Sequence, residues 1–333
     1  MKHHLAATYG LSTLYYGLHS QPMTRFSTLL GTLVILFGGA CITPAEVDFA
    51  EAEQELVVYS HFGVGESMKI YLTHTRDPLQ PNQPFEPVED ATIKVYRDGE
   101  LVSHLYHGDA PDKKVEYMAL YDTEVLAIEG SHYQIEVMAE GYKNARSVET
   151  VPYRKASIIN FEFVENTEAG KLYRLRFSDD ESIENYYQLV IKELVRDMTD
   201  SIVSNEIVDY ELVRSSAFTH FNNNTTWTTI YPDYAGFLFT GVHEEGGFKE
   251  LFVEIPDEER TSTDETHSYR YKVELHNISD AYFLYHQSIY TQLTDNNPLN
   301  EPIGIYNNIE NGFGNFSAYN AVITEADALP AGE

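Results

Sequence analysis

Histidine and acidic side chains near residue 105 are the first candidates for chemistry in this chain. His104, His107 and Asp109 are residue types that bind zinc through imidazole nitrogens and carboxylate oxygens. His104 falls in a predicted β-strand, and residues three apart on a strand point to opposite faces. A single metal ion would therefore need a bulge or a turn between the two histidines, and we expect no zinc site here.

A second candidate is the acidic run Asp179-Asp180-Glu181, which is followed by Glu184. Carboxylate oxygens are the ligands that calcium prefers, but the run lacks the Asp-x-Asp-x-Asp-Gly order of a calcium loop. A charged run of this kind is typical of a solvated turn. The chain also lacks a Gly-x-Ser-x-Gly elbow, a His-Glu-x-x-His helix and a phosphate-binding glycine loop. We expect a protein that is not an enzyme, with no catalytic residue, no metal and no cofactor.

Cys41, the single cysteine of the chain, is the third candidate. Arg25 gives a positive start, residues 26–37 are mostly apolar, and the small residues 38–40 precede the cysteine. This is the order of a secretory signal peptide, and the run is too short for a comfortable membrane span. The pattern is similar to a bacterial lipobox, which predicts that Cys41 is lipidated. An ordinary signal peptide with an incidental cysteine is the alternative, because position 38 is Gly.

The segments on either side of Cys41 complete the expected export region. We expect translation to start at Met23, so that residues 1–40 form a leader and signal peptide. Residues 41–55 are acidic and read as a tether, either a solvated spacer or a segment that resembles the export signal of surface lipoproteins in Bacteroidetes. The whole chain carries a formal charge of −30. Such acidity argues against nucleic acid as a partner, because binding it requires a basic patch.

Residues 56–152 have the pattern of an all-β domain. Short alternating segments such as Ala91–Arg97 and His132–Met138 are predicted strands. Asp98-Gly99 is a strong signal for a two-residue hairpin turn. We expect a β-sandwich here, immunoglobulin-like or carboxypeptidase-regulatory-like.

One loop of this domain has its own order. Pro78, Pro81, Pro84 and Pro87 recur every three residues, with Phe85 among them. Polyproline II has three residues per turn, so the prolines would line one face of an extended segment. The segment could dock on an aromatic groove of a partner, or it could be a stiff connector between two strands.

The spacing of apolar residues over 153–326 predicts a second β-rich domain that contains one helix. Tyr282, Tyr285, Ile289 and Leu293 fall at helical spacing. The helix is expected over residues 279–293, with Ser279 as its cap and its apolar stripe on the sheet of the second domain. The final strand is expected over 315–323. Residues 327–333 read as a disordered tail.

Several segments, taken in their order along the chain, resemble the Bacteroidetes lipoprotein family called domain of unknown function 4249. They are Cys41, Leu56–Tyr59, Pro87–Val95, Gly141-Tyr142 before Val151-Pro152, Ser279–Leu293 and Ile309–Phe316. The resemblance implies a mainly β envelope lipoprotein with an N-terminal immunoglobulin-like domain, often encoded beside a TonB-dependent outer-membrane receptor. It implies no reaction and no catalytic residue.

Two classes of function therefore stay open. The first is a non-catalytic lipoprotein of the outer membrane, on the cell surface or the periplasmic face, that assists a TonB-dependent receptor in cargo capture or uptake. The second is a stand-alone surface module that binds a glycan or a peptide. The proline segment is the predicted partner-binding site in the first class.

Overall fold

The structure is a computed structural model, and it describes most of the chain after the tether. The described residues are 53–77, 84–106, 114–115, 118–154, 156–179, 185–214, 220–222, 236–240, 248–256, 266–294 and 304–328.

The first part of the described chain is a β-sandwich. Its two facing layers share one core, in which Tyr121 and Phe62 from one layer meet Tyr133 and Ile135 from the other. One layer is a four-stranded sheet with the order β4-β3-β7-β8. Its strands are β3 (Thr92–Arg97), β4 (Glu100–Leu105), β7 (His132–Met138) and β8 (Ala145–Thr150). The other layer contains β1 (Leu56–Gly63), β2 (Ser67–His74), β5 (Lys114–Val115) and β6 (Met118–Leu126).

Two details of the sandwich test the sequence patterns. Asp98 and Gly99 both have positive φ, 51° and 85°, so the Asp-Gly turn between β3 and β4 forms as expected. The sequence analysis did not identify β6. Tyr121 on that strand is fully buried, and its hydroxyl donates to the Val88 carbonyl over 2.9 Å.

The second part of the described chain packs another four-stranded sheet, with the order β13-β16-β10-β9, on further strands. Tyr173, Leu175 and Leu251 of this sheet share a core with Leu189 and Val273 of the facing strands. The sheet contains β9 (Ser157–Asn166), β10 (Gly170–Ser178), β13 (Glu211–Arg214) and β16 (Phe248–Pro256). The facing strands are β11 (Tyr186–Asp197), β12 (Ile202–Ile207), β14 (His220–Asn222), β15 (Phe237–Thr240) and β17 (His267–Ile278).

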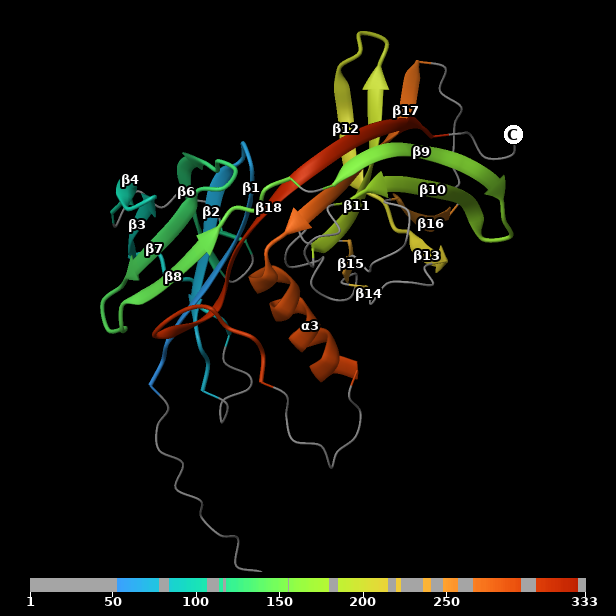
Figure 1. Cartoon of the computed structure of the whole chain (residues 1–333). Helices are drawn as coiled ribbons and strands as arrows, with labels where there is room; N and C mark the ends of the chain where they lie inside the picture. Colours follow the sequence, from blue (N-terminus) through green and yellow to red (C-terminus); the bar gives the residue numbers. More distant parts are fainter. Residues whose placement is uncertain are drawn as a thin grey trace, which may run out of the picture. The chain divides into compact units, whose positions relative to one another are not determined.

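The last strand, β18 (Gly312–Asp327), joins the two parts (Figure 1). Its first half pairs in parallel with β1, from Leu56↔Gly312 to Gly63↔Tyr319. Its second half pairs antiparallel with β17, from Ile278↔Tyr319 to Arg270↔Asp327. Among the described residues, one ten-stranded sheet therefore runs through both parts. The strand is longer than the expected 315–323, and it includes the first residue of the predicted tail; Ala328 after it is buried.

The helix α3 (Asp280–Thr294) covers a face of this sheet (Figure 1). Tyr282 and Phe283 are buried among residues of both parts, including Tyr59 of β1 and Leu238 of β15. The helix therefore packs on strands of the second part, as expected, and also on strands of the first part, because β18 brings β1 and β2 into the same sheet. The carbonyl of Ser279 accepts from the Tyr282 and Phe283 amides, as at a helix start.

The mainly β fold with one packed helix is confirmed among the described residues. The predicted domain boundary between residues 152 and 153 stays a prediction. The ten-stranded sheet contains strands from both sides of this boundary.

Glycine at position 314 is what allows β18 to approach β1. Its φ is +120°, and a Cβ built there would lie 1.9 Å from the carbonyl oxygen of Val58. No side chain fits this space without moving the β1 backbone. We predict that Gly314→Ala lowers the free energy of unfolding by more than about 2 kcal/mol, through backbone strain and a displaced ladder.

Urea unfolding followed by circular dichroism measures this effect. Gly304→Ala is the matched control, because no atom lies within 4 Å of the added Cβ. It should change stability by less than about 0.5 kcal/mol. Equal effects of the two substitutions would contradict the role of Gly314.

Candidate functional site

The described part of the proline segment lies beside the point where the chain enters β1. Pro87 bridges to Thr73 of β2, and Pro84 is exposed. Phe85 is 40% exposed, and the Arg76 guanidinium lies 3.8 Å from its ring centroid. Pro78 and Pro81 lie outside the described residues, as does Cys41, so the polyproline spacing and the lipidation stay predictions.

The entry of the chain is tied to the same end of β2. The Thr75 amide donates to the Glu55 carbonyl over 2.9 Å, and the Glu55 amide donates to the Thr75 hydroxyl over 3.0 Å. The Glu53 carboxylate pairs with Lys143 over 2.8 Å. The last residues of the predicted tether and the residues that flank the proline segment are therefore neighbours.

The structure describes only part of the zinc and calcium candidates. His104 lies on β4, whereas His107 and Asp109 fall outside the described residues, as do Asp180, Glu181 and Glu184. Among the residues that the structure describes, no group of three His, Cys, Asp or Glu side chains could hold a metal ion.

Asp179 is a buried structural residue. Its side chain is 2% exposed and pairs with the equally buried Lys249 over 2.5 Å. The Tyr187 hydroxyl and the Asn185 amide also donate to it. The interpretation of Asp179 as part of a solvated turn is wrong, because β10 carries it into contact with β11 and β16.

We predict that Lys249→Met lowers the free energy of unfolding by about 3–5 kcal/mol, since it leaves the Asp179 carboxylate buried without its counter-charge. Adding Asp179→Asn should recover most of the loss, because the amide is neutral and can still accept from Tyr187. Urea unfolding of the single and double variants measures both steps. A loss below about 1 kcal/mol for Lys249→Met would contradict a tightly buried pair.

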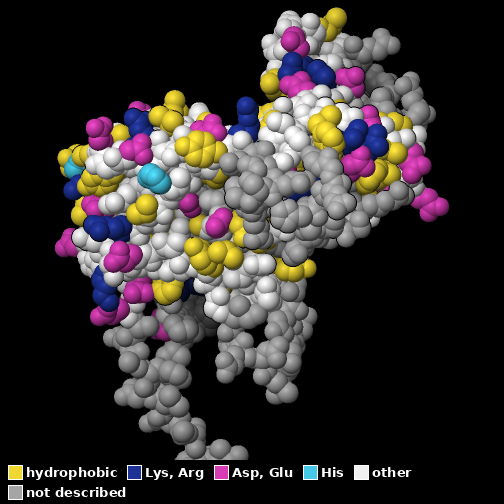
Figure 2. Space-filling model, in the orientation of Figure 1, with side chains coloured by type: hydrophobic (Ala, Val, Ile, Leu, Met, Phe, Trp, Pro, Cys, Tyr) yellow, Lys and Arg dark blue, Asp and Glu magenta, His cyan; other side chains and the backbone are white. Residues whose placement is uncertain are grey.

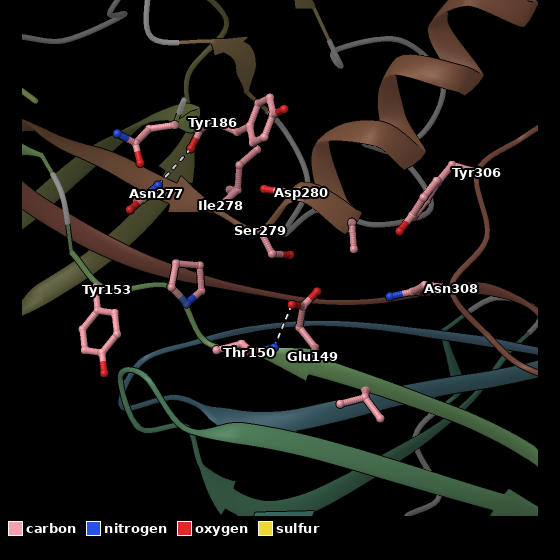
Figure 3. A pocket seen from close by; sticks show the side chains of 14 residues that line it. Glu149, Thr150, Tyr153, Tyr186, Asn277, Ile278, Ser279, Asp280, Tyr306 and Asn308 are labelled. Atoms are coloured by element: carbon pink, nitrogen blue, oxygen red, sulfur yellow. Dashed lines mark hydrogen bonds between the residues drawn. The ribbon is translucent and has the colours of Figure 1, made fainter. Parts of the chain in front are cut away.

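A pocket of about 470 Å³ lies between the end of β8 and the junction of β17 with α3 (Figure 3). β8 supplies Glu149, the helix start supplies Asp280, and the loop before β18 supplies Tyr306. None of the described lining residues is Lys, Arg or His. The lining residues are Val148, Glu149, Thr150, Pro152, Tyr153, Asn185, Tyr186, Asn277, Ile278, Ser279, Asp280, Ala281, Tyr306 and Asn308.

The loop that carries Tyr306 is fixed by hydrogen bonds to both neighbours. The Asn308 side chain donates to the Phe316 carbonyl over 2.7 Å and accepts from the Phe316 amide over 2.9 Å. The Ser147 hydroxyl donates to the Asn308 carbonyl over 2.7 Å. The Tyr306 amide donates to the Ser288 hydroxyl of α3 over 2.9 Å. The loop therefore connects β8, β18 and the helix, and it holds the pocket wall in place.

The Glu149 carboxyl group has a shifted pKa in this pocket. Burial raises its pKa to about 7, and the neighbouring Asp280 carboxylate acts in the same direction. The Thr150 amide, which donates to Glu149 over 2.8 Å, and the Ser279 hydroxyl only partly oppose this shift. Burial, Glu149 and Asp280 also raise the pKa of Tyr306. Perturbed groups in a concave pocket are typical of binding or reactive sites.

Sequence reasoning did not find this pocket. Glu149 is an ordinary polar position on an alternating strand, and Asp280 reads as a favourable acidic residue in a first helical turn. The two residues are 131 positions apart, and β18 brings their elements together. The sequence therefore carries no local signal for the pocket.

The described architecture is that of a mainly β protein whose sandwich continues into a second β-rich part. The family profile of the domain of unknown function DUF4249 matches residues 42–324. The chain belongs to this family. No curated protein matches it. A crystal structure of bovine butyrophilin is similar at 10% identity over 67% of this chain and 92% of that chain, and its TM-score of 0.18 adds nothing to the fold described above. In the described residues, no helix is long and apolar enough to cross a membrane.

We predict that Glu149→Gln stabilises the protein at alkaline pH. A carboxyl whose pKa rises on folding binds more protons in the folded state. Its favourable contribution is complete below the unfolded pKa of 4.5 and is lost as pH rises through about 7. At pH 8.5 the variant should exceed wild type by up to about 3 kcal/mol, at about 1.4 kcal/mol per pKa unit.

Urea unfolding at pH 4.5 and pH 8.5 measures the difference between the two proteins. Glu254→Gln is the matched control, because Glu254 is a half-buried carboxyl on a strand of the other sheet. It should show no such pH-dependent gain. A Glu149→Gln difference that is the same at both pH values would contradict the raised pKa.

Proposed function

We propose that this protein is a non-catalytic lipoprotein, anchored to the outer membrane through Cys41, that assists a TonB-dependent receptor in cargo capture or uptake. The lipid anchor and the receptor come from the sequence pattern and from the family resemblance, by analogy. The anchored protein would stand on the cell surface or on the periplasmic face of the membrane. Glycan or peptide is the cargo class that this proposal leaves open.

One geometric observation supports the docking part of the proposal. The chain enters β1 beside Thr75, and the proline segment returns beside Thr73 on the same strand. If Cys41 is anchored, the chain that leads from the lipid would enter the sandwich at the end that carries the proline segment.

The chemistry of the segment suits docking. Phe85 presents an exposed ring, and Arg76 lies over it as a cation–π partner. Aromatic and arginine side chains are enriched at the centres of protein interfaces. Prolines stiffen the segment before binding, which reduces the conformational entropy lost on association. On the face shown in Figure 2, the described hydrophobic side chains lie scattered between charged ones.

The rival function is a stand-alone surface module that binds a glycan or a peptide. The pocket around Glu149 favours this alternative, because it has room for a small polar group and is lined by three tyrosines. The two functions differ in their main partner, which is a membrane protein in the first and a soluble ligand in the second.

We predict that Phe85→Ala weakens recovery of a TonB-dependent receptor in a pull-down from envelopes solubilised in mild detergent. The loss of a central aromatic contact should reduce recovery by at least about tenfold. Phe248→Ala is the matched control, because Phe248 is also an exposed phenylalanine with an arginine, Arg176, near its ring. It should leave recovery unchanged.

Cys41→Ala should abolish labelling by a palmitate analogue in the same cells. Equal labelling of wild type and variant would contradict the anchor. Recovery of no receptor by wild type, together with saturable binding of the purified protein to a polysaccharide, would favour the stand-alone module.

A further inference from the structure

The pocket around Glu149 and Asp280 has an unbalanced set of charges. Glu149 and Asp280 are both carboxyl groups, and no described lining residue carries a positive charge. Asp280 is exposed, and no described residue forms a side-chain hydrogen bond or an ion pair with its carboxylate. Burial holds Glu149 partly neutral near pH 7, which is the response of a carboxyl that has lost water and gained no cation.

Asn277 has an unsatisfied amide oxygen beside this pocket. It lines the pocket and is 4% exposed. Its Nδ2 donates to the Tyr186 carbonyl over 3.2 Å, but its Oδ1 has no hydrogen-bond partner among the described residues. A buried amide oxygen without a donor costs about 1–3 kcal/mol.

Aromatic side chains complete the lining. Tyr153, Tyr186 and Tyr306 all line the pocket, and Tyr186 is held in place by stacking on Phe283 with 4.4 Å between the ring centroids. Tyrosine faces attract cations through their quadrupole. Figure 3 shows Glu149 reaching from β8 toward the Ser279–Asp280 corner, with Tyr306 on the far side of the same space.

The contrast with Asp179 shows what the pocket lacks. Asp179 is also buried, but Lys249, Tyr187 and Asn185 all donate to it. The buried carboxylate of Asp179 is therefore balanced by a cation of the same chain, Lys249. The carboxyls of the pocket have no such cation among the lining residues, although the pocket has room for one.

We propose that this pocket binds an organic cation, either a primary ammonium or a guanidinium group, between Glu149 and Asp280. The cation is a small amine or a lysine or arginine side chain of a bound peptide. Its positive group pairs with the two carboxylates, and its alkyl chain lies against the tyrosine rings. This inference does not depend on the receptor-docking proposal, because it uses none of residues 73–88.

Binding is coupled to a proton. At pH 7 part of the Glu149 population is protonated, and pairing with a cation requires the ionised form. The bound state therefore releases a fraction of a proton, and affinity rises as pH increases from 6 to 8. Asp280, Tyr153, Tyr186 and Tyr306 are the other titratable groups that line the pocket. Tyr306, whose pKa is raised, stays neutral over this range.

Isothermal titration calorimetry of the purified protein with putrescine tests the proposal. The matched ligand control is 1,4-butanediol, which has the same carbon chain and no charge. We expect saturable binding of putrescine at pH 8, up to about tenfold weaker binding at pH 6, and no binding of the diol. Titrations in phosphate and in HEPES, which has no primary amine, should differ in apparent enthalpy, because their ionisation enthalpies differ and a proton is released.

Glu149→Gln should weaken putrescine binding by at least tenfold and abolish both the pH dependence and the buffer dependence. Glu254→Gln should leave all three unchanged. Equal binding of putrescine and the diol, or putrescine binding that Glu149→Gln does not alter, would overturn the proposal. So would the absence of any binding up to 10 mM by putrescine, by agmatine and by a short arginine-containing peptide. Binding of the peptide alone would assign the pocket to a peptide side chain, and binding of the small amines as well would assign it to free amines.

Discussion

The double pairing of β18 is the constraint on which the rest of the described structure depends. One half of this strand hydrogen-bonds to β1 and the other half to β17, so the first and last strands of the chain lie in one sheet. The parallel half requires a backbone approach that only glycine permits at position 314. Because of this pairing, α3 rests on strands from both parts, and the end of β8 comes to the start of the helix.

Two carboxyl side chains, one buried and one half-buried, show how the same chemical group serves different ends. Asp179 receives an ammonium, a hydroxyl and an amide donor, so its charge is balanced inside the protein. Glu149 receives one backbone amide and weak support from Ser279, and burial raises its pKa to about 7. A buried charge that lacks a partner destabilises the folded state. Such a cost is more easily understood at a binding pocket than in a structural core.

The two proposed interaction sites use different parts of the molecule. The proline segment lies beside the entry of the chain into β1, whereas the pocket lies between β8 and the β17–α3 junction. A protein with this arrangement can contact a membrane partner through one site and a soluble ligand through the other. The acidic character of the whole chain would attract a cationic ligand toward the pocket at low ionic strength.

The sequence alone determined many of the strand-forming segments, the Asp98-Gly99 hairpin and the helix expected over residues 279–293, because each depends on local periodicity or on a turn preference. It predicted the export region from residue types around Cys41. Only the tertiary structure decided the partners of β18, since backbone pairing between residues 56 and 312 leaves no trace in local pattern. The same holds for the ion pair of Asp179 with Lys249 and for the pocket at Glu149. At Asp179 and at Glu149, elements that are far apart in the sequence shield a carboxyl group from water. Only the packing of these elements determines whether a cationic side chain lies beside that carboxyl group.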